Sequence, residues 1–459
     1  MENLRVLSGS VAVLNDIPAR YLHPGDSPTQ SRDYLLPGYF HDQYISLHLP
    51  ENSLTTGTLF LGQPRCGKTN TIFLLADQVL NHMGPDDLAV FFDIKGDYQR
   101  AFYEEGDLVL DSLSSRYVCN IYDEVLTYKN NSLLLKMRVR ELCSYLYEES
   151  ARDAGQNRFF VDGAQAVTEC LFLCLLQSDT ADSELNNANF LRLIGGAAPS
   201  DDTTDQALDH TYEEFLKVLN SDPDFYSARM YLPADPDARR EGYGVLSEIS
   251  RMVQRVFVGS FALAAHPERS ISAESVAHRP GPTVLFLNYH PDYSRSQTYA
   301  FRFFVDSLIA NRCRFHHGRG RTYFFLDELA RLPKLLYLEP AMTLMRQANC
   351  CIVAGLQTVS QLYSVYGDRE AQTILGAFQN LFVFNCDEPS QTFLQGRTRS
   401  ALVQQRFVRA DGRIDYTAPA PRRCIESWDF TGLQQGECFV QLADSSQPFR
   451  CRFTKNCIG

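Results

Sequence analysis

The sequence predicts an α/β fold in which a mostly parallel sheet carries a glycine-rich loop and an all-helical segment interrupts the sheet. Three observations support this prediction. Short apolar strands alternate with helical patterns in residues 58–111 and again in residues 281–459. The stretch between them, residues 112–280, shows mainly helical periodicity. Residues 62–69 match the pattern G-x-x-x-x-G-K-[ST], and the match lies between an apolar strand and a helix.

Composition narrows the class of protein. The 459 residues are 44% hydrophobic and 21% charged, which is enough for a buried core and two or three structural units. The apolar runs are short and the N-terminus lacks the features of a signal peptide, so we expect a cytoplasmic protein, held peripherally at the inner face of the plasma membrane only through partners. The net charge of −12 argues against a protein that coats nucleic acid over its whole surface, but not against one that grips it in a narrow channel.

The glycine-rich loop has the residues that phosphate binding needs. An apolar strand, Thr58–Leu61, precedes the loop, and helical periodicity follows from Asn70 to Leu80. The glycines let the backbone fold tightly round a phosphate, and the positive end of the helix adds to the field. Lys68 would reach the β- and γ-phosphates, and the Thr69 hydroxyl would hold Mg²⁺. The residues predicted to bind the nucleotide are Gly62, Gln63, Pro64, Arg65, Cys66, Gly67, Lys68 and Thr69.

The composition and hydrophobic periodicity of the sequence predict the elements in the first half of the chain. Residues 1–57 are polar and rich in proline, so we expect short strands and loops that lead into the core. The stretch from Ser178 to Glu241 is acidic, and it is either a solvated surface or a docking face for a basic partner. Within it, Gly195–Gln206 reads as a loop or hinge. The expected strand is Ala89–Asp93, and the expected helices are Ser132–Glu149, Phe159–Leu176 and Gly244–Ala265.

After residue 280, short apolar strands again alternate with helical patterns. Residues 394–435 are polar and predict irregular structure, and the end of the chain predicts a closing hairpin. The expected strands are Thr283–Tyr289, Thr322–Leu326, Cys351–Leu356, Leu381–Asn385, Glu437–Leu442 and Phe449–Phe453. The expected helices are Gln297–Cys313, Leu338–Ala348 and Glu370–Asn380.

Two of these strands end in polar residues of catalytic type. An apolar strand followed by Asp327 and Glu328 is typical of the Walker B arrangement. Asp327 would hold Mg²⁺ through water, and Glu328 would orient or deprotonate the attacking water. The alternative is that the two carboxylates simply begin a helix. Gln357, at the end of the next strand, would sense the nucleotide or hold the water.

Taken in order, these motifs resemble the type IV coupling protein family of TraD, TraG and TrwB type. The resemblance covers roughly residues 55–455, includes the helical insertion, and implies a RecA-like P-loop ATPase of the FtsK/HerA group. Such motors use ATP and Mg²⁺ and feed DNA or protein into type IV secretion and conjugation channels. Beyond residues 62–69, the motifs are Asp93-Ile-Lys-Gly-Asp97, Leu326-Asp-Glu-Leu-Ala-Arg-Leu-Pro-Lys-Leu335, Gly355-Leu-Gln-Thr-Val-Ser-Gln-Leu362 and Tyr366-Gly-Asp-Arg-Glu-Ala-Gln-Thr373.

The resemblance also implies roles for single residues. Arg346 would act as an arginine finger in the neighbouring subunit's site, which makes hydrolysis depend on a homohexamer. The implied catalytic residues are Lys68, Glu328, Gln357 and Arg346, and the implied metal ligands are Thr69 and Asp327. Most members of the family begin with transmembrane helices, which we do not find here. We therefore expect either a separate membrane-anchor subunit or a soluble branch of the family.

Three functions remain open on the sequence alone. The first is a hexameric motor that moves DNA, as a single strand with an attached relaxase, to a secretion channel. The second is a coupling adaptor whose acidic insertion selects protein substrates, and the third is a HerA-like pump for duplex DNA. Candidate channel residues for a DNA motor are Arg397, Arg399 and Arg406. The expected division is a lead-in at 1–57, a nucleotide-binding domain at 58–111 and 281–459, and an all-helical insertion domain at 112–280.

Overall fold

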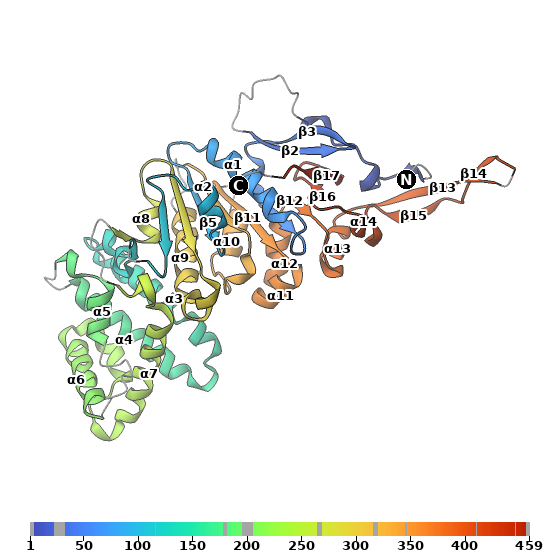
Figure 1. Cartoon of the computed structure of the whole chain (residues 1–459). Helices are drawn as coiled ribbons and strands as arrows, with labels where there is room; N and C mark the ends of the chain where they lie inside the picture. Colours follow the sequence, from blue (N-terminus) through green and yellow to red (C-terminus); the bar gives the residue numbers. More distant parts are fainter. Residues whose placement is uncertain are drawn as a thin grey trace. The chain divides into compact units, whose positions relative to one another are not determined.

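The chain divides into two compact units. The first consists of residues 1–107, 280–286 and 312–459 and carries the main sheet, and the second consists of residues 108–279 and 287–311 and is mostly helical (Figure 1). The computed structural model describes residues 4–22, 33–114, 116–177, 181–194, 205–263, 269–314, 320–344, 347–409, 411–445 and 447–455.

The strands of the first unit lie in the order β3-β2-β17-β16-β12-β4-β11-β10-β5-β9. From β12 to β5 the neighbours are parallel, and from β12 outward to β3 they are antiparallel. The strands are β2 (Tyr34–Phe40), β3 (Gln43–Leu49), β4 (Thr58–Leu61), β5 (Leu88–Asp93), β9 (Thr283–Asn288), β10 (Thr322–Leu326), β11 (Cys350–Leu356), β12 (Asn380–Val383), β16 (Glu437–Gln441) and β17 (Phe449–Phe453).

The parallel strands are apolar along their whole length because both faces of the sheet are covered. Every residue of β4, β5, β10 and β11 is buried. The predicted mostly parallel sheet is therefore confirmed, and it places the carboxyl ends of β4, β10 and β11 at one edge. The helices of this unit are α1 (Lys68–Asn81), α2 (Asp97–Phe102), α10 (Leu338–Leu344), α11 (Val359–Tyr366), α12 (Asp368–Ala377), α13 (Glu388–Gln395) and α14 (Ser427–Thr431).

The second unit is built around its own apolar core. Four of its long helices, α3, α4, α6 and α7, bury aromatic and aliphatic side chains together, among them Tyr147, Phe172, Phe215 and Ile249. Its elements are β6 (Leu108–Asp111), β7 (Val118–Cys119), α3 (Ser132–Asp153), α4 (Arg158–Gln177), α5 (Asn187–Ile194), α6 (Asp205–Ser221), α7 (Arg239–Val256), β8 (Ser270–Ile271), α8 (Ala273–Ala277) and α9 (Ser294–Arg314).

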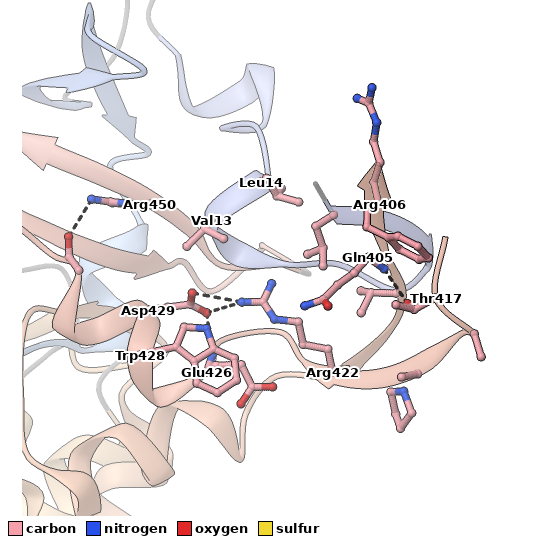
Figure 2. Close-up of a pocket in the computed structure, with 17 residues that line it drawn as sticks. Val13, Leu14, Gln405, Arg406, Thr417, Arg422, Glu426, Trp428, Asp429 and Arg450 are labelled. Atoms are coloured by element: carbon pink, nitrogen blue, oxygen red, sulfur yellow. Dashed lines mark hydrogen bonds and ion pairs between the residues drawn. The ribbon is translucent and has the colours of Figure 1, made fainter. Parts of the chain in front are cut away.

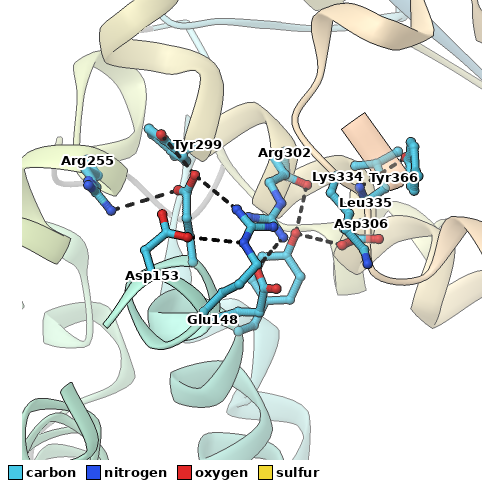
Figure 3. A network of polar contacts seen from close by, with 12 residues as sticks. Glu148, Asp153, Arg255, Tyr299, Arg302, Asp306, Lys334, Leu335 and Tyr366 are labelled. Carbon is cyan, nitrogen blue, oxygen red and sulfur yellow. Dashed lines mark hydrogen bonds and ion pairs between the residues drawn. The ribbon is translucent and has the colours of Figure 1, made fainter. Parts of the chain in front are cut away.

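Polar contacts fasten α9 to α3 within this unit. The Tyr145 hydroxyl donates a hydrogen bond of 2.7 Å to Asp306, and Arg302 pairs with Glu148 at 2.8 Å (Figure 3). The guanidinium of Arg302 is almost fully buried, so this pairing is what makes its burial tolerable.

The acidic stretch from Ser178 to Glu241 is part of that core. Its helices α5 and α6 contribute Phe190, Tyr212 and Leu219, all fully buried. The expected loop at Gly195–Gln206 falls mostly outside the described residues, and α6 begins at Asp205. Removing the acidic stretch would therefore open the core rather than trim a surface.

One stretch of the described helices, Gly155–Gln177, is long and apolar enough to cross a membrane by length and composition alone. The expectation of short apolar runs overlooked it because Asp162 and Glu169 interrupt its apolar residues. Since 56% of its most apolar window is buried inside the protein, core packing accounts for that composition.

The division of the chain differs from the expected one in two places. Residues 1–57, expected as a separate lead-in, supply β2 and β3 to the main sheet. Residues 287–311, expected in the nucleotide-binding domain, group with the helical unit because α9 packs on its core through Phe303. Helix α7 also ends at Val256 rather than at residue 265, and Gly259, with φ +52°, starts a new turn.

The prediction of irregular structure at residues 394–435 is wrong. This region forms most of a separate four-stranded sheet, here called the β arm, which extends away from the main sheet (Figure 1). Its central strand pairs with β1, at the other end of the chain, so no local pattern reveals it. The β arm consists of β1 (Leu4–Ser8), β13 (Ser400–Val408), β14 (Ile414–Tyr416) and β15 (Ala420–Arg423).

Candidate functional site

The glycine-rich loop joins β4 to α1 and is held by backbone contacts from later parts of the chain. The N–H of Gln63 donates to the carbonyl of Asn385 at 3.0 Å, and the N–H of Gly436 donates to the carbonyl of Cys66 at 2.8 Å. Gly67 has φ +108°, and a Cβ added there would lie 2.8 Å from the Cα of Gly436. Only glycine fits at this position, because the backbone of residue 67 is left-handed and the backbone of Gly436 leaves no room for a side chain.

Helix α1 starts directly after this loop and brings Lys68 and Thr69 to the edge of the sheet. The N–H groups of its first turn have no partners inside the helix, so they and the helix dipole favour an anion. The Lys68 ammonium lies 3.8 Å from the Asp327 carboxylate, and the Thr69 hydroxyl donates to the same carboxylate at 2.9 Å. The structure thus brings the adjacent Lys68 and Thr69 to a carboxylate that lies 258 residues further along the chain.

Asp327 has the surroundings of a metal ligand. Its side chain is nearly buried, and its Oδ1 atom accepts no hydrogen bond from the residues that the structure describes. Burial raises its pKa, which the charge of Lys68 opposes. A buried carboxylate with an open oxygen beside a hydroxyl suits a hard cation such as Mg²⁺, so these residues fit the metal that the motifs imply.

Two residues beside Asp327 were not predicted to belong to the site from the sequence. Burial and then the charge of Asp327 hold the pKa of the Tyr98 phenol well above its usual value, and that hydroxyl lies buried on α2. A Cβ added at Gly355 on β11 would lie 2.2 Å from the Asp327 carbonyl oxygen and 2.6 Å from Oδ1. The motif that begins at Gly355 was predicted to supply Gln357, but nothing in the pattern showed that Asp327 leaves no room for a side chain at Gly355.

Glu328 and Gln357 line one open cleft with Lys68. The cleft has a volume of about 370 Å³ and lies at the edge where β10 and β11 end. Glu328 accepts a hydrogen bond of 3.0 Å from Arg331, which also lines the cleft. Arg331 is therefore a further residue of the site, and only its place three residues after Glu328 could have pointed to it. Arg346 lies outside the described residues.

The Asp93 motif has a structural role in this state of the protein. The buried Asp93 carboxylate accepts backbone N–H groups from Lys95, Asp97 and Gln99, which shapes the turn into α2. Burial raises its pKa, and these hydrogen bonds act against that rise.

The fold and this site define a P-loop protein of the α/β class. The family described as "Type IV secretion-system coupling protein DNA-binding domain" matches residues 43–193 and 274–394, more than half of the chain. The chain belongs to this family. A comparison with curated proteins finds no match.

Solved structures show the same fold. A bacterial conjugative coupling protein, TrwBdeltaN70 with sulphate, has 16% identity and a TM-score of 0.69, over 98% of this chain and 95% of that chain. The plasmid coupling protein TrwB in complex with ADP and Mg²⁺ has 16% identity and a TM-score of 0.68 over the same shares. VirB4 of Thermoanaerobacter pseudethanolicus has 13% identity and a TM-score of 0.54, over 94% of this chain and 99% of that chain.

Proposed function

We propose that this chain is an ATPase that works as a homohexameric motor and moves DNA to a type IV secretion and conjugation channel. The observation that carries the proposal is the buried contact of Asp327 with Lys68 and Thr69 beside an open cleft. Membership of the coupling family and the TrwB structure with ADP and Mg²⁺ support the same function. The transported substrate is a single DNA strand with an attached relaxase, and type IV secretion subunits receive it at the membrane.

The residues of the site divide into those that bind and those that activate. Lys68 and the first turn of α1 bind the phosphates of ATP. Thr69 and Asp327 hold Mg²⁺, which neutralises charge on the phosphates when it is bound. Glu328 orients the attacking water or takes its proton, and Gln357 holds that water in the same cleft.

Two further arginines control this chemistry. Arg331 holds one oxygen of the Glu328 carboxylate, Oε2, which orients the group and leaves the second oxygen to act on water. Arg346 of a neighbouring subunit neutralises charge as the phosphate is transferred, and this makes turnover depend on assembly.

Ion pairs within the helical unit reduce the charge that the acidic stretch offers to a basic partner. Five of its described carboxylates have basic partners there, as Glu213 does in Arg239 and Glu214 in Lys217. Asp182 is likewise paired with Lys129 at 2.6 Å. Paired carboxylates offer little net charge to a basic partner.

The test is the rate of ATP hydrolysis without nucleic acid, with single-stranded DNA and with duplex DNA at low salt. We expect single strands to stimulate the rate most. Glu328→Gln should keep ATP bound and lower the rate by about 10²–10⁴-fold, the usual contribution of a general base. Lys68→Ala should weaken ATP binding, and Glu105→Gln, in an exposed loop, is the matched control.

Hydrolysis by Glu328→Gln at the wild-type rate would show that the Walker B assignment is wrong. Stimulation by a basic protein but never by DNA would replace the motor with the adaptor, and stimulation by duplex DNA alone would favour the duplex pump.

A further inference from the structure

The arginines after residue 396 are partly used inside the protein. Arg397, expected in a channel, is half-buried and donates to the carbonyls of Phe378 and Leu375. That expectation is wrong, because its guanidinium closes the end of α12. At the base of the β arm, Arg422 pairs with Asp429 at 2.9 Å in a groove of about 1080 Å³ (Figure 2). These charges stabilise the fold, and reactive chemistry outside the ATP site comes instead from thiols.

The described part of the chain contains twelve cysteines, and all of them are free thiols. Nine are buried, and three are partly exposed, namely Cys66, Cys174 and Cys313. Burial raises the pKa of Cys66 and of Cys174, which keeps both in the less reactive protonated form. Cys313 differs from these two because a second thiol lies beside it.

Cys313 lies in the last turn of α9, and Cys350 is the first residue of β11. Their thiols are hydrogen-bond partners. Neighbouring contacts place them together independently, because the Nε of Arg312 donates to the Thr322 hydroxyl and Thr322 lies opposite Cys350 in the β10–β11 pair. The backbone N–H of Thr322 also donates to the carbonyl of Asn349 at 3.0 Å. The fold of the first unit therefore holds the two thiols side by side.

The two thiols have different surroundings. Cys350 is fully buried, whereas Cys313 is partly exposed. The hydrogen bond from Cys350 holds the pKa of the Cys313 thiol below its usual value, although burial opposes this effect, and the charge of Arg312 adds to it. An accessible thiol with a lowered pKa beside a second thiol is typical of a redox-sensitive pair, in which the outer sulfur meets the oxidant and the inner sulfur completes the disulfide.

A second pair of cysteines shows what accessibility adds. Cys438 lies opposite Cys451 in the β16–β17 pair, so these two thiols are also neighbours. Both are fully buried, and burial raises the pKa of each, that of Cys451 to about 12. A buried and protonated thiol offers no thiolate to an oxidant. Both pairs are therefore close, but only the pair of Cys313 and Cys350 is open to attack.

We propose that Cys313 and Cys350 form a reversible disulfide when the protein meets hydrogen peroxide. The Cys313 thiolate attacks one peroxide oxygen, which breaks the O–O bond, gives a sulfenic acid and releases hydroxide that is protonated to water. The Cys350 thiol then displaces the hydroxyl group from that sulfur, so the S–S bond forms and a second water leaves. The two sulfurs together lose two electrons, which the peroxide gains. A thiol reductant such as glutathione restores both thiols by exchange.

The disulfide would enclose the segment that carries the Walker B residues. Asp327, Glu328 and Arg331 lie between the two cysteines in the chain, so the bond closes residues 313–350 into a covalent loop. Loop closure removes conformations from the unfolded chain and thereby stabilises the folded one. The oxidised protein should therefore resist unfolding better than the reduced protein. This chemistry goes beyond the proposed motor and does not depend on it.

The test treats the full, nucleotide-free chain with hydrogen peroxide, blocks the remaining thiols with N-ethylmaleimide and digests the protein with trypsin in the absence of a reductant. Trypsin should release Cys313 in the dipeptide 313–314 and Cys350 in the peptide 347–369. We expect mass spectrometry to find these two peptides joined, and dithiothreitol to separate them. The midpoint of thermal unfolding should rise by about 5 °C on oxidation and return after reduction.

The decisive variants are Cys313→Ser and, at the buried position, Cys350→Ala. Each should abolish both the joined peptides and the rise in unfolding temperature on oxidation. Cys351 lies in the same peptide as Cys350 and is retained in both variants, so the loss in Cys350→Ala identifies the reacting sulfur. The matched control is Cys174→Ser, which removes another partly exposed thiol and should behave as the wild type does in both measurements.

Separate peptides after peroxide treatment of the wild type would refute the proposal. Joined peptides that persist in Cys350→Ala would also refute it, because Cys351 would then be the partner. A disulfide between Cys438 and Cys451 at the same peroxide dose would overturn the argument from accessibility. An unchanged unfolding temperature in the linked protein would show that the bond does not constrain the Walker B segment. None of these outcomes bears on DNA-stimulated hydrolysis, so the proposed motor stands or fails separately.

Discussion

Gly355→Ala should damage the ATP site without replacing any residue that is predicted to bind ATP or Mg²⁺. The added methyl group would lie 2.2 Å from the carbonyl oxygen of Asp327 and 2.6 Å from its Oδ1. An ordinary contact needs about 1 Å more, so β10 must move or the carboxylate must rotate. We expect a loss of about 1–3 kcal/mol of stability from overpacking and a fall of roughly 10²-fold in turnover, as for a 1 Å misplacement.

The assays are ATP hydrolysis at saturating ATP and Mg²⁺ and thermal unfolding of the nucleotide-free protein. Gly376→Ala is the matched control, because it lies in α12 with no atom within 4 Å of the added Cβ. That change should stabilise the protein by up to about 1 kcal/mol, since alanine favours helix, and should leave hydrolysis unchanged. Wild-type turnover in Gly355→Ala would refute the claim that this contact positions Asp327.

Two further predictions concern pH and assembly. Burial, aided by the nearby charge of Glu274, raises the pKa of Glu124 from 4.5 to about 7. Between these two pH values the folded state holds a proton that the unfolded state has released, so the helical unit should lose about 3 kcal/mol of stability as the pH rises from 4.5 to about 7. Glu124→Gln should remove this part of the pH dependence of thermal unfolding. An unchanged pH profile would contradict the prediction. Separately, Arg346→Ala subunits mixed with Glu328→Gln subunits should regain part of the hydrolysis that each lacks alone. No recovery at any mixing ratio would argue against a site shared between subunits.

Local patterns predicted the elements whose signal lies within a few residues. The apolar run before the loop became β4 with the expected bounds, and the helix after it became α1, which starts two residues earlier than expected. The placement of Asp327 beside Thr69 also followed, because parallel strands that end at one edge bring their next residues together.

Contacts between distant parts of the chain were beyond such patterns. Strand β13 stayed hidden because its partners are β1 and two short strands of low apolar content. The close packing of Gly67 against Gly436 could not be predicted either, because no sequence pattern links two glycines that lie 369 positions apart. Acidic composition likewise concealed the helical spacing of Tyr212, Phe215 and Leu219, which fixes α6 in the core.

The position of β4 in the sheet affects how the protein is made. Its two neighbours are β11 and β12, which end at residues 356 and 383, while β4 itself ends at residue 61. During synthesis β4 therefore has no neighbouring strand until most of the chain has left the ribosome. The helical unit, which is encoded between β4 and β11, can already form its own core by then. A nascent chain that stops short of β12 should fold its helices and still be unable to hold a nucleotide.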